Sequence, residues 1–175
     1  MYKPKKGGWA TIPLFIERNT MKDIIYIKGD ATAPIGDDNK LLIHCSNDEG
    51  GWGRGFVLAL SKKWKEPERQ YRQWYRSKNG FKLGKVQFVK VEKDIVVCNM
   101  IGQHKTKTIG KVPPIRYGAI AKCLESVMVA AKKNNASVHA PRFGSALAGG
   151  SWDKIKELII EHLSSHDIQI TIYDL

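Results

Sequence analysis

Short apolar runs alternate with longer amphipathic segments along most of the chain, and this alternation limits the possible folds more than any other feature. Residues 24–27 and 41–45 are apolar runs bounded by turn residues. Such runs are typical of strands that are buried on both faces. Residues 55–64 and 67–76 then carry helical patterns. Strands interleaved with helices predict an α/β protein whose sheet is covered on both faces.

The second half of the chain continues the alternation. Its apolar runs span residues 86–91, 95–101, 137–140 and 168–173. The first two are separated only by a three-residue turn, so they predict an antiparallel hairpin. A long helix is expected after Pro113-Pro114, where apolar residues recur at three- and four-residue spacing. Ser151 is expected to cap another helix. The sequence therefore predicts a mixed, roughly six-stranded sheet in an α/β/α arrangement of three layers.

The chain of 175 residues fits one domain. Residues 1–20 contain two prolines, a Gly-Gly pair and no clear period. We expect them to form an N-terminal extension, with a short edge strand at 12–16, and the domain to span residues 21–175. No apolar run approaches the roughly 20 residues that a membrane span needs. No secretory signal is expected either, because no continuous apolar segment with a small-residue cleavage site follows the basic start.

Cysteine usage points to a reducing compartment. Cys45, Cys98 and Cys123 are odd in number, widely spaced and without a CxxC pair. This pattern disfavours a disulfide framework and a zinc site, so we expect a cytoplasmic protein with no bound metal and no cofactor.

The formal net charge is +12, and the basic residues are clustered. Residues 62–78 hold seven basic and two acidic side chains, and residues 1–20 hold four and one. A third basic stretch lies in residues 105–116. The positive electrostatic potential of such clusters attracts nucleic acid and phosphorylated metabolites alike. A solvated, solubilising surface is the alternative interpretation.

Two glycine-rich loops each follow an expected strand and precede an expected helix. The first spans residues 47–56 and the second residues 143–150. Glycines let a backbone approach a ligand closely, and helix N-termini offer free N–H groups to anions. In sheets of this type, ligands lie beyond the carboxyl ends of the strands. The two loops together predict a cleft that holds a diphosphate by main-chain donors. Neither loop matches a Walker A or Rossmann pattern.

Asp30 ends the first expected strand. Its carboxylate is placed to accept a hydrogen bond from an exocyclic amine such as adenine N6. An ordinary turn aspartate is the alternative interpretation.

These segments together resemble the macro domain. The resemblance is carried by Tyr26-Ile27-Lys28-Gly29-Asp30-Ala31, by Ile43-His44-Cys45-Ser46-Asn47 with the Gly-Trp-Gly-Arg-Gly loop, and by Pro141-Arg142-Phe143-Gly144-Ser145-Ala146-Leu147. It runs from about residue 22 to the C-terminus. Within the family the chain resembles a compact branch that contains the fungal ADP-ribose 1″-phosphate phosphatases and the ADP-ribose-glutamate hydrolases.

The resemblance implies a set of residues that bind ADP-ribose or ADP-ribose 1″-phosphate. Asp30 corresponds to the adenine-binding aspartate, with Ala31 beside it, and Asn47 to the polar residue near the distal ribose. Leu175 corresponds to a C-terminal residue close to the adenosine. The residues of the two diphosphate loops are Trp52, Gly53, Arg54, Gly55 and Phe56 in the first, and Pro141, Phe143, Gly144, Ser145, Ala146 and Leu147 in the second.

Two departures bear on activity. The glutamate-ADP-ribose hydrolases use a lysine and an aspartate where this chain has Gln103 and Ala148, and neither residue can serve as nucleophile or base. The chain therefore looks closer to the phosphatases. A phosphatase needs a group that positions or deprotonates water. The candidates by location are His44, Asp48, Glu49 and His104. The mid-strand position of His44 among apolar residues favours a structural histidine over a catalytic one. The two acids can equally be interpreted as solvated loop charges.

Three functions of different classes are consistent with the sequence. The first is a metal-independent phosphatase acting on ADP-ribose 1″-phosphate. The second is a non-catalytic module that binds free or protein-linked ADP-ribose. The third is a domain that binds RNA or poly(ADP-ribose) through its basic face. ADP-ribosylated protein and nucleic acid are accordingly candidate partners, and a membrane is not.

Overall fold

The computed structural model describes residues 21–175, so the expected extension and the strand at 12–16 lie outside the described residues. Six strands form one sheet in the order β1-β6-β5-β2-β4-β3. They are β1 (Ile24–Lys28), β2 (Asn39–Asn47), β3 (Val86–Lys90), β4 (Ile95–Gln103), β5 (Ala136–Pro141) and β6 (Ile170–Asp174). All neighbouring pairs are parallel except β3 and β4. The expected mixed sheet and its antiparallel hairpin are both confirmed.

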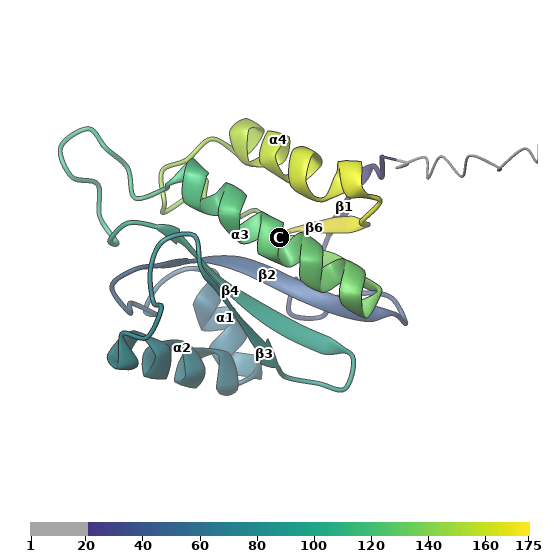
Figure 1. The fold of residues 1–175 in the computed structure, drawn as a ribbon, viewed down its shortest axis with the longest axis horizontal. Coiled ribbons are helices and arrows are strands. Elements are labelled where there is room, and N and C mark those ends of the chain that lie inside the picture. The colour runs from purple at the N-terminus through teal and green to yellow at the C-terminus, as the bar shows by residue number, and fades with distance from the viewer. Residues whose placement is uncertain (1–20) are drawn as a thin grey trace, which may run out of the picture.

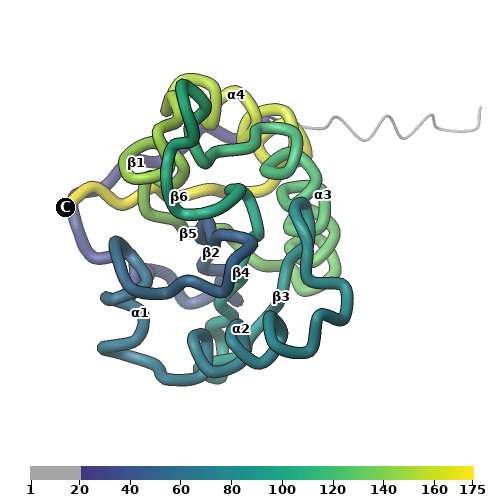
Figure 2. The backbone as a smooth tube through the Cα atoms, turned by 90° about the vertical axis from the view of Figure 1, so that its left-hand side faces the viewer, coloured from purple at the N-terminus to yellow at the C-terminus, as the bar shows by residue number. Residues whose placement is uncertain are grey.

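Helices cover both faces of the sheet, which confirms the three-layer arrangement (Figure 1). The α-helices are α1 (Phe56–Lys63), α2 (Glu66–Ser77), α3 (Tyr117–Asn134) and α4 (Trp152–His162), and a short 3-10 helix follows at Ser164–His166. Helices α3 and α4 lie on one side of the sheet, and α1 and α2 lie on the other (Figures 1 and 2).

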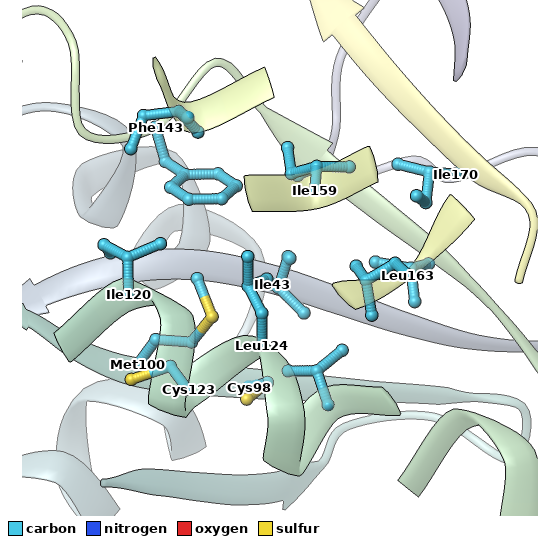
Figure 3. Close-up of a cluster of buried hydrophobic side chains, with 14 of the residues drawn as sticks. Ile43, Cys98, Met100, Ile120, Cys123, Leu124, Phe143, Ile159, Leu163 and Ile170 are labelled. Atoms are coloured by element: carbon cyan, nitrogen blue, oxygen red, sulfur yellow. The ribbon is translucent and has the colours of Figure 1, made fainter. Parts of the chain in front are cut away.

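The central strands are buried because each contributes to two cores. Successive side chains of a strand point to opposite faces. Accordingly Ile43 of β2 belongs to the larger core under α3 and α4, which Figure 3 shows with Leu124 and Ile159. Its neighbour Leu42 belongs to a smaller core with Leu60 and Tyr71, under α1 and α2. This double burial explains why the strands read as apolar runs and not as alternating patterns.

The starts of α3 and α4 lie where the sequence predicts them. Helix α3 begins at Tyr117, and just before it the Arg116 guanidinium donates to the carbonyls of residues 113–115. Ser151 is the N-cap residue of α4, as expected, with φ −95° and ψ 126°, but its side chain makes no capping hydrogen bond. Its backbone N–H instead donates to the Tyr117 hydroxyl at 2.8 Å.

The loops that follow β2, β4 and β5 all emerge at the carboxyl edge of the sheet, which faces the viewer in Figure 2. Strand β2 is paired with both β4 and β5. The sheet order therefore brings the two glycine-rich loops next to each other, although about a hundred residues separate them in the sequence.

Candidate functional site

A cavity of about 420 Å³ opens between the two glycine-rich loops. Most of the residues expected to bind the ligand line it: Asn47, Trp52, Gly53, Arg54, Gly55, Phe56, Pro141, Phe143, Gly144, Ala146 and Leu147. The remaining residues of the lining, which the sequence did not assign to binding, are Cys45, Ser46, Gly51, Val57, Gln103, Thr106, Arg142 and Ala148. The loops thus enclose a volume in the range of small-molecule sites.

Free main-chain donors are the chief polar feature of this cavity. Within residues 21–175, the N–H groups of residues 53–57 and 144–148 have no acceptor in the protein. The first group includes the start of α1, where N–H groups cannot bond within the helix. An N-cap at Gly55 with φ 80° and ψ −150° lies in a region essentially restricted to glycine. Free main-chain donors of this kind are the groups with which helix starts and turns hold anions in proteins.

Asn47 shapes the first loop with its side chain. Its Oδ1 accepts the N–H groups of Glu49 at 3.0 Å and Gly51 at 2.9 Å, and its Nδ2 donates to the Gly51 carbonyl at 2.8 Å. The loop also rests on α2, because the Tyr71 hydroxyl donates to the Asn47 carbonyl at 2.6 Å. Tyr75 of the same helix packs so closely on Gly50 that a Cβ there would lie 2.3 Å from the ring. Helix α2 therefore fixes the path of the loop.

The second loop is held by its own backbone, by α4 and by Ile115 in the segment that precedes α3. Gly144 has φ +75°, and a Cβ there would lie 2.9 Å from Ile115 and 3.1 Å from Ile155. The Gly150 N–H donates to the Gly144 carbonyl at 2.9 Å. Gly53 of the first loop differs, because its φ is ordinary and a Cβ there would meet no atom within 4 Å. Bulk can thus be added at Gly53 without disturbing the fold, whereas Gly144 is required for it.

Arg142 lines the cavity, although the sequence did not assign it to binding. Its guanidinium pairs with Asp174, with Nε–Oδ1 at 2.5 Å and Nη2–Oδ2 at 3.0 Å. It also lies over the rings of Tyr26 and Trp152, at 5.1 and 5.0 Å. The hydrogen bonds to Arg142 lower the pKa of the Asp174 carboxyl. The Pro-Arg-Phe-Gly motif was the available signal, since it places an arginine directly at the end of a strand.

The residues expected near adenine lie outside the cavity lining, as does Ser145. Asp30 is exposed, and its Oδ1 accepts the Thr32 N–H and hydroxyl at 2.8 Å each. Ala31 is buried in the smaller core, and Leu175 is fully exposed. The loop after β1 is nevertheless adjacent to the site, because the Gly29 N–H donates to the carbonyl of Asp174, the partner of Arg142.

His44 occupies a structural position and not the cavity. It is 1% exposed and packs against Trp52 and Phe56. Its Nε2 lies 2.6 Å from Oδ1 of Asn99. The Nδ2 of Asn99 donates to the Pro67 carbonyl, so its Oδ1 is the acceptor and the His44 Nε2–H donates to it. Burial lowers the pKa of His44 to about 4. A neutral, enclosed imidazole has no access to a ligand, which favours the structural interpretation of this residue.

Asp48 and His104 form a pair at the mouth of the cavity. Asp48 Oδ2 lies 2.7 Å from His104 Nδ1, and Oδ1 accepts the Lys105 N–H at 2.7 Å. Because a carboxylate only accepts, the Nδ1–H of His104 is the donor in this contact, and no hydrogen bond to its Nε2 is formed within residues 21–175. Neither side chain lines the cavity itself, but their neighbours Asn47 and Gln103 do. Glu49 makes only a long contact, 3.5 Å from the Thr106 hydroxyl.

The cavity floor carries no strong nucleophile. Gln103 and Ala148 both line it, at the positions that the sequence comparison with the hydrolases assigned to a lysine and an aspartate. Cys45 also lines it, but burial raises the pKa of its thiol to about 12. In residues 21–175, no group of three or more histidines, cysteines, aspartates or glutamates is arranged to hold a metal ion. The same part of the chain contains no helix long and apolar enough to span a bilayer.

The fold and the cavity define an α/β protein with a cavity at the carboxyl edge of its sheet, bordered by main-chain N–H groups that have no acceptor in residues 21–175. Comparison with known proteins makes the class specific. A macrodomain protein from Streptomyces coelicolor is 47% identical, with a TM-score of 0.79 over 87% of this chain and 99% of that chain. A protein of unknown function from Bacteroides thetaiotaomicron is 55% identical, with a TM-score of 0.86 over 87% and 98%. The chain belongs to the macro domain family.

Curated and more distant relatives add context. Mouse chromodomain-helicase-DNA-binding protein 1-like is 32% identical over 95% of this chain, which spans only 19% of that protein. The ADP-ribose 1″-phosphate phosphatase of Lodderomyces elongisporus is 27% identical over 85% of this chain and 98% of its own. Thermosipho africanus DarTG, solved with ADP-ribose, is 18% identical with a TM-score of 0.65 over 76% of this chain and 37% of that one, and so shows the fold alone. No family model matches the chain.

Proposed function

We propose that the cavity binds ADP-ribose, with the diphosphate held by the free N–H groups of residues 53–57 and 144–148. These two sets of donors carry the proposal, because they surround one cavity and have no acceptor within the described chain. Main-chain donors at helix starts suit a diphosphate, whose charge they stabilise without a buried counter-ion. The DarTG structure with ADP-ribose and the fungal phosphatase, which share this fold or this sequence pattern, support the choice of ligand.

The two ends of the ligand follow from the surroundings of the loops. The adenine lies toward the loop after β1, where Asp30 accepts from its amine and Arg142 with Trp152 forms the adjoining wall. The distal ribose lies toward Asn47 and the Asp48–His104 pair. This orientation agrees with the position of Asn47 in the lining and with the hydrogen bond from the Gly29 N–H, next to Asp30, to the Asp174 carbonyl.

We propose further that the protein hydrolyses the phosphomonoester of ADP-ribose 1″-phosphate. His104 Nε2 accepts a proton from a water molecule, and Asp48 holds the imidazole in the required tautomer. The water oxygen bonds to phosphorus as the bond to the ribose oxygen breaks. The ribose oxygen takes the proton from His104 Nε2, which restores the base, and ADP-ribose and inorganic phosphate leave. The 2.7 Å contact between Asp48 and His104 supports this assignment, and His44 is left out because it is enclosed.

Steady-state release of phosphate from ADP-ribose 1″-phosphate tests the proposal. The variants His104→Ala and Asp48→Asn should lower turnover by about 10²–10⁴, the usual contribution of a general base, and leave ADP-ribose affinity nearly unchanged. Glu49→Gln, at the same loop, should have little effect. His166→Asn is the matched control, because it removes an imidazole from a segment remote from the cavity lining. Full activity of His104→Ala would exclude it as the base.

A binding module without catalysis is the second candidate. The observation that favours it is the cavity lining, which contains Gln103, Ala148 and a protonated thiol but no ionised acid or free imidazole. Calorimetric titration with ADP-ribose beside the phosphatase assay separates the two candidates. Tight binding with no phosphate release would support the module and exclude the phosphatase.

A further inference from the structure

We propose that one face of α2 is a binding surface for a single strand of nucleic acid, separate from the ADP-ribose cavity. Four basic side chains form this surface, and we call them the α2 basic row: Lys65, Arg69, Arg72 and Arg76. Together with Glu68 they line a concavity of about 290 Å³ of their own, which shares no residue with the main cavity.

The row is straight because of its spacing. Its members are four, three and four residues apart, so at about 100° per residue they fall within roughly 60° of one another around the helix. Lys65, the N-cap residue, continues this alignment because its φ of −81° and ψ of −26° are helical. The row is about 16 Å long at a rise of about 1.5 Å per residue. A line of cations of this kind follows one phosphate backbone.

The opposite side of α2 is buried, so the row faces solvent. Tyr71 is fully buried and Pro67 is buried as well. The outer face of the helix lies on the far side of the sheet from α3 and α4 (Figure 1). Arginine predominates in the row, and its planar guanidinium matches phosphate oxygens in pairs.

Existing ion pairs neutralise the row only in part. Glu66 pairs with Arg69 at 2.6 Å and Glu68 with Arg72 at 2.9 Å. Lys65 and Arg76 form no ion pair within residues 21–175. The Glu66–Arg69 pair is solvent-exposed, and exposed pairs contribute little, so a phosphate can compete for the Arg69 guanidinium. The Glu68–Arg72 pair is partly buried, and Glu68 also accepts from the Ser61 hydroxyl.

The row leads to the entrance of the main cavity. The Arg72 Nη1 donates to the Gly50 carbonyl of the first loop at 3.2 Å. The Lys105 N–H also donates to Asp48 of this loop, and Lys107 and Lys111 follow in the sequence. A strand bound along α2 therefore passes beside the first loop of the cavity.

Binding of a fluorescent oligodeoxythymidine of about 12 nucleotides, a length within the usual site sizes, tests the proposal. The affinity is measured between about 50 and 200 mM salt, where loss of phosphate contacts is most visible. The row variant Lys65→Gln/Arg69→Gln/Arg76→Gln spares Arg72, which supports the first loop. The control Lys132→Gln/Lys133→Gln/Lys156→Gln removes the same charge from exposed positions on α3 and α4.

Wild-type protein should bind the strand with a steep salt dependence. The row variant should weaken binding at least about tenfold, and the slope of log affinity against log salt should fall by about 2, since each lost contact accounts for about 0.7. The control should stay within about twofold, because charge remote from the strand acts only through a screened field. Both variants should keep the wild-type melting temperature and ADP-ribose affinity, so this result is independent of the cavity.

Four outcomes would overturn the proposal. The first is that the wild-type protein does not bind the oligonucleotide at low salt. The second is that both variants weaken binding equally, which would indicate that net charge alone accounts for the affinity. A polyglutamate peptide of equal charge would compete as well as the oligonucleotide, which would indicate an acidic protein partner. A duplex would bind more tightly than the single strand.

Discussion

Asp30 follows β1, as the sequence predicts, but one of its two carboxylate oxygens already accepts hydrogen bonds within the protein. Its Oδ1 is engaged by Thr32, whereas no protein group within the described chain donates to its Oδ2. That oxygen is available to an adenine amine. The residue is therefore both a turn aspartate and a candidate ligand contact.

Asp30→Ala should weaken ADP-ribose binding by about 1.5–3 kcal/mol, the range for a hydrogen bond to a charged group. The dissociation constant from calorimetry measures this change. Asp37→Ala is the matched control, because Asp37 is an exposed carboxylate in the same loop. An unchanged constant for Asp30→Ala would remove this residue from the site.

Gln103 and Ala148 define a second residue-scale expectation. Both side chains line the cavity, and neither can attack or deprotonate. Release of ADP-ribose from modified glutamate should therefore be negligible, as followed by loss of label from an ADP-ribosylated protein. Rapid release that persists in Gln103→Ala would show that the correspondence with the hydrolases, or the mechanism it implies, does not apply.

At the scale of elements, the two glycine-rich loops differ in what their glycines do. Gly50 and Gly144 have φ of +75° and tight neighbours, so they are needed to fold the loops. Gly53 has free space on its Cβ side and faces the cavity. Of these three glycines, only Gly53 can be substituted to test diphosphate binding without also disturbing the fold of its loop.

Gly53→Val should abolish ADP-ribose binding and keep a cooperative thermal transition, because the added methyl groups occupy the cavity and not the core. Calorimetric titration and thermal unfolding give the two readouts. Gly118→Val is the control, since Gly118 also has an ordinary φ and open space at its Cβ, but lies on α3. Normal binding by Gly53→Val would mean that the diphosphate lies elsewhere.

At the scale of the whole molecule, two buried histidines connect stability to pH. His44 sits under α1, and His139 is hydrogen-bonded to the Tyr173 hydroxyl at 2.8 Å. Burial is the main cause that lowers the pKa of each to about 4, from 6.5. The unfolded chain therefore binds more protons than the folded protein between these values.

The free energy of unfolding should thus be highest above pH 6.5 and fall as the pH drops toward 4. Each histidine can contribute up to about 3 kcal/mol to this loss. Denaturant titrations at a series of pH values measure it. His139→Gln should flatten part of the profile, and His166→Asn, a less buried histidine, should not. A flat wild-type profile between pH 6.5 and 4 would contradict the burial argument.

The local sequence determined the elements and the ligand-facing loops. Apolar runs marked the strands because central strands such as β2 are buried on both faces, and helical spacing marked α3 and α4. The glycine-rich segments identified the cavity walls, because only glycine permits the backbone at Gly55 and Gly144. The Pro-Arg-Phe-Gly motif contained Arg142 without revealing its aromatic and carboxylate partners.

The tertiary structure alone decided which side chains meet. His44 and Asn47 lie three residues apart on β2, but only Asn47, at the carboxyl end of the strand, lines the cavity, because Trp52 and Phe56 pack against His44 and enclose it. The Asp48–His104 pair joins positions 56 residues apart, through the pairing of β2 with β4. Such contacts depend on sheet order, and sheet order is a property of the whole packed chain. Local spacing cannot supply it.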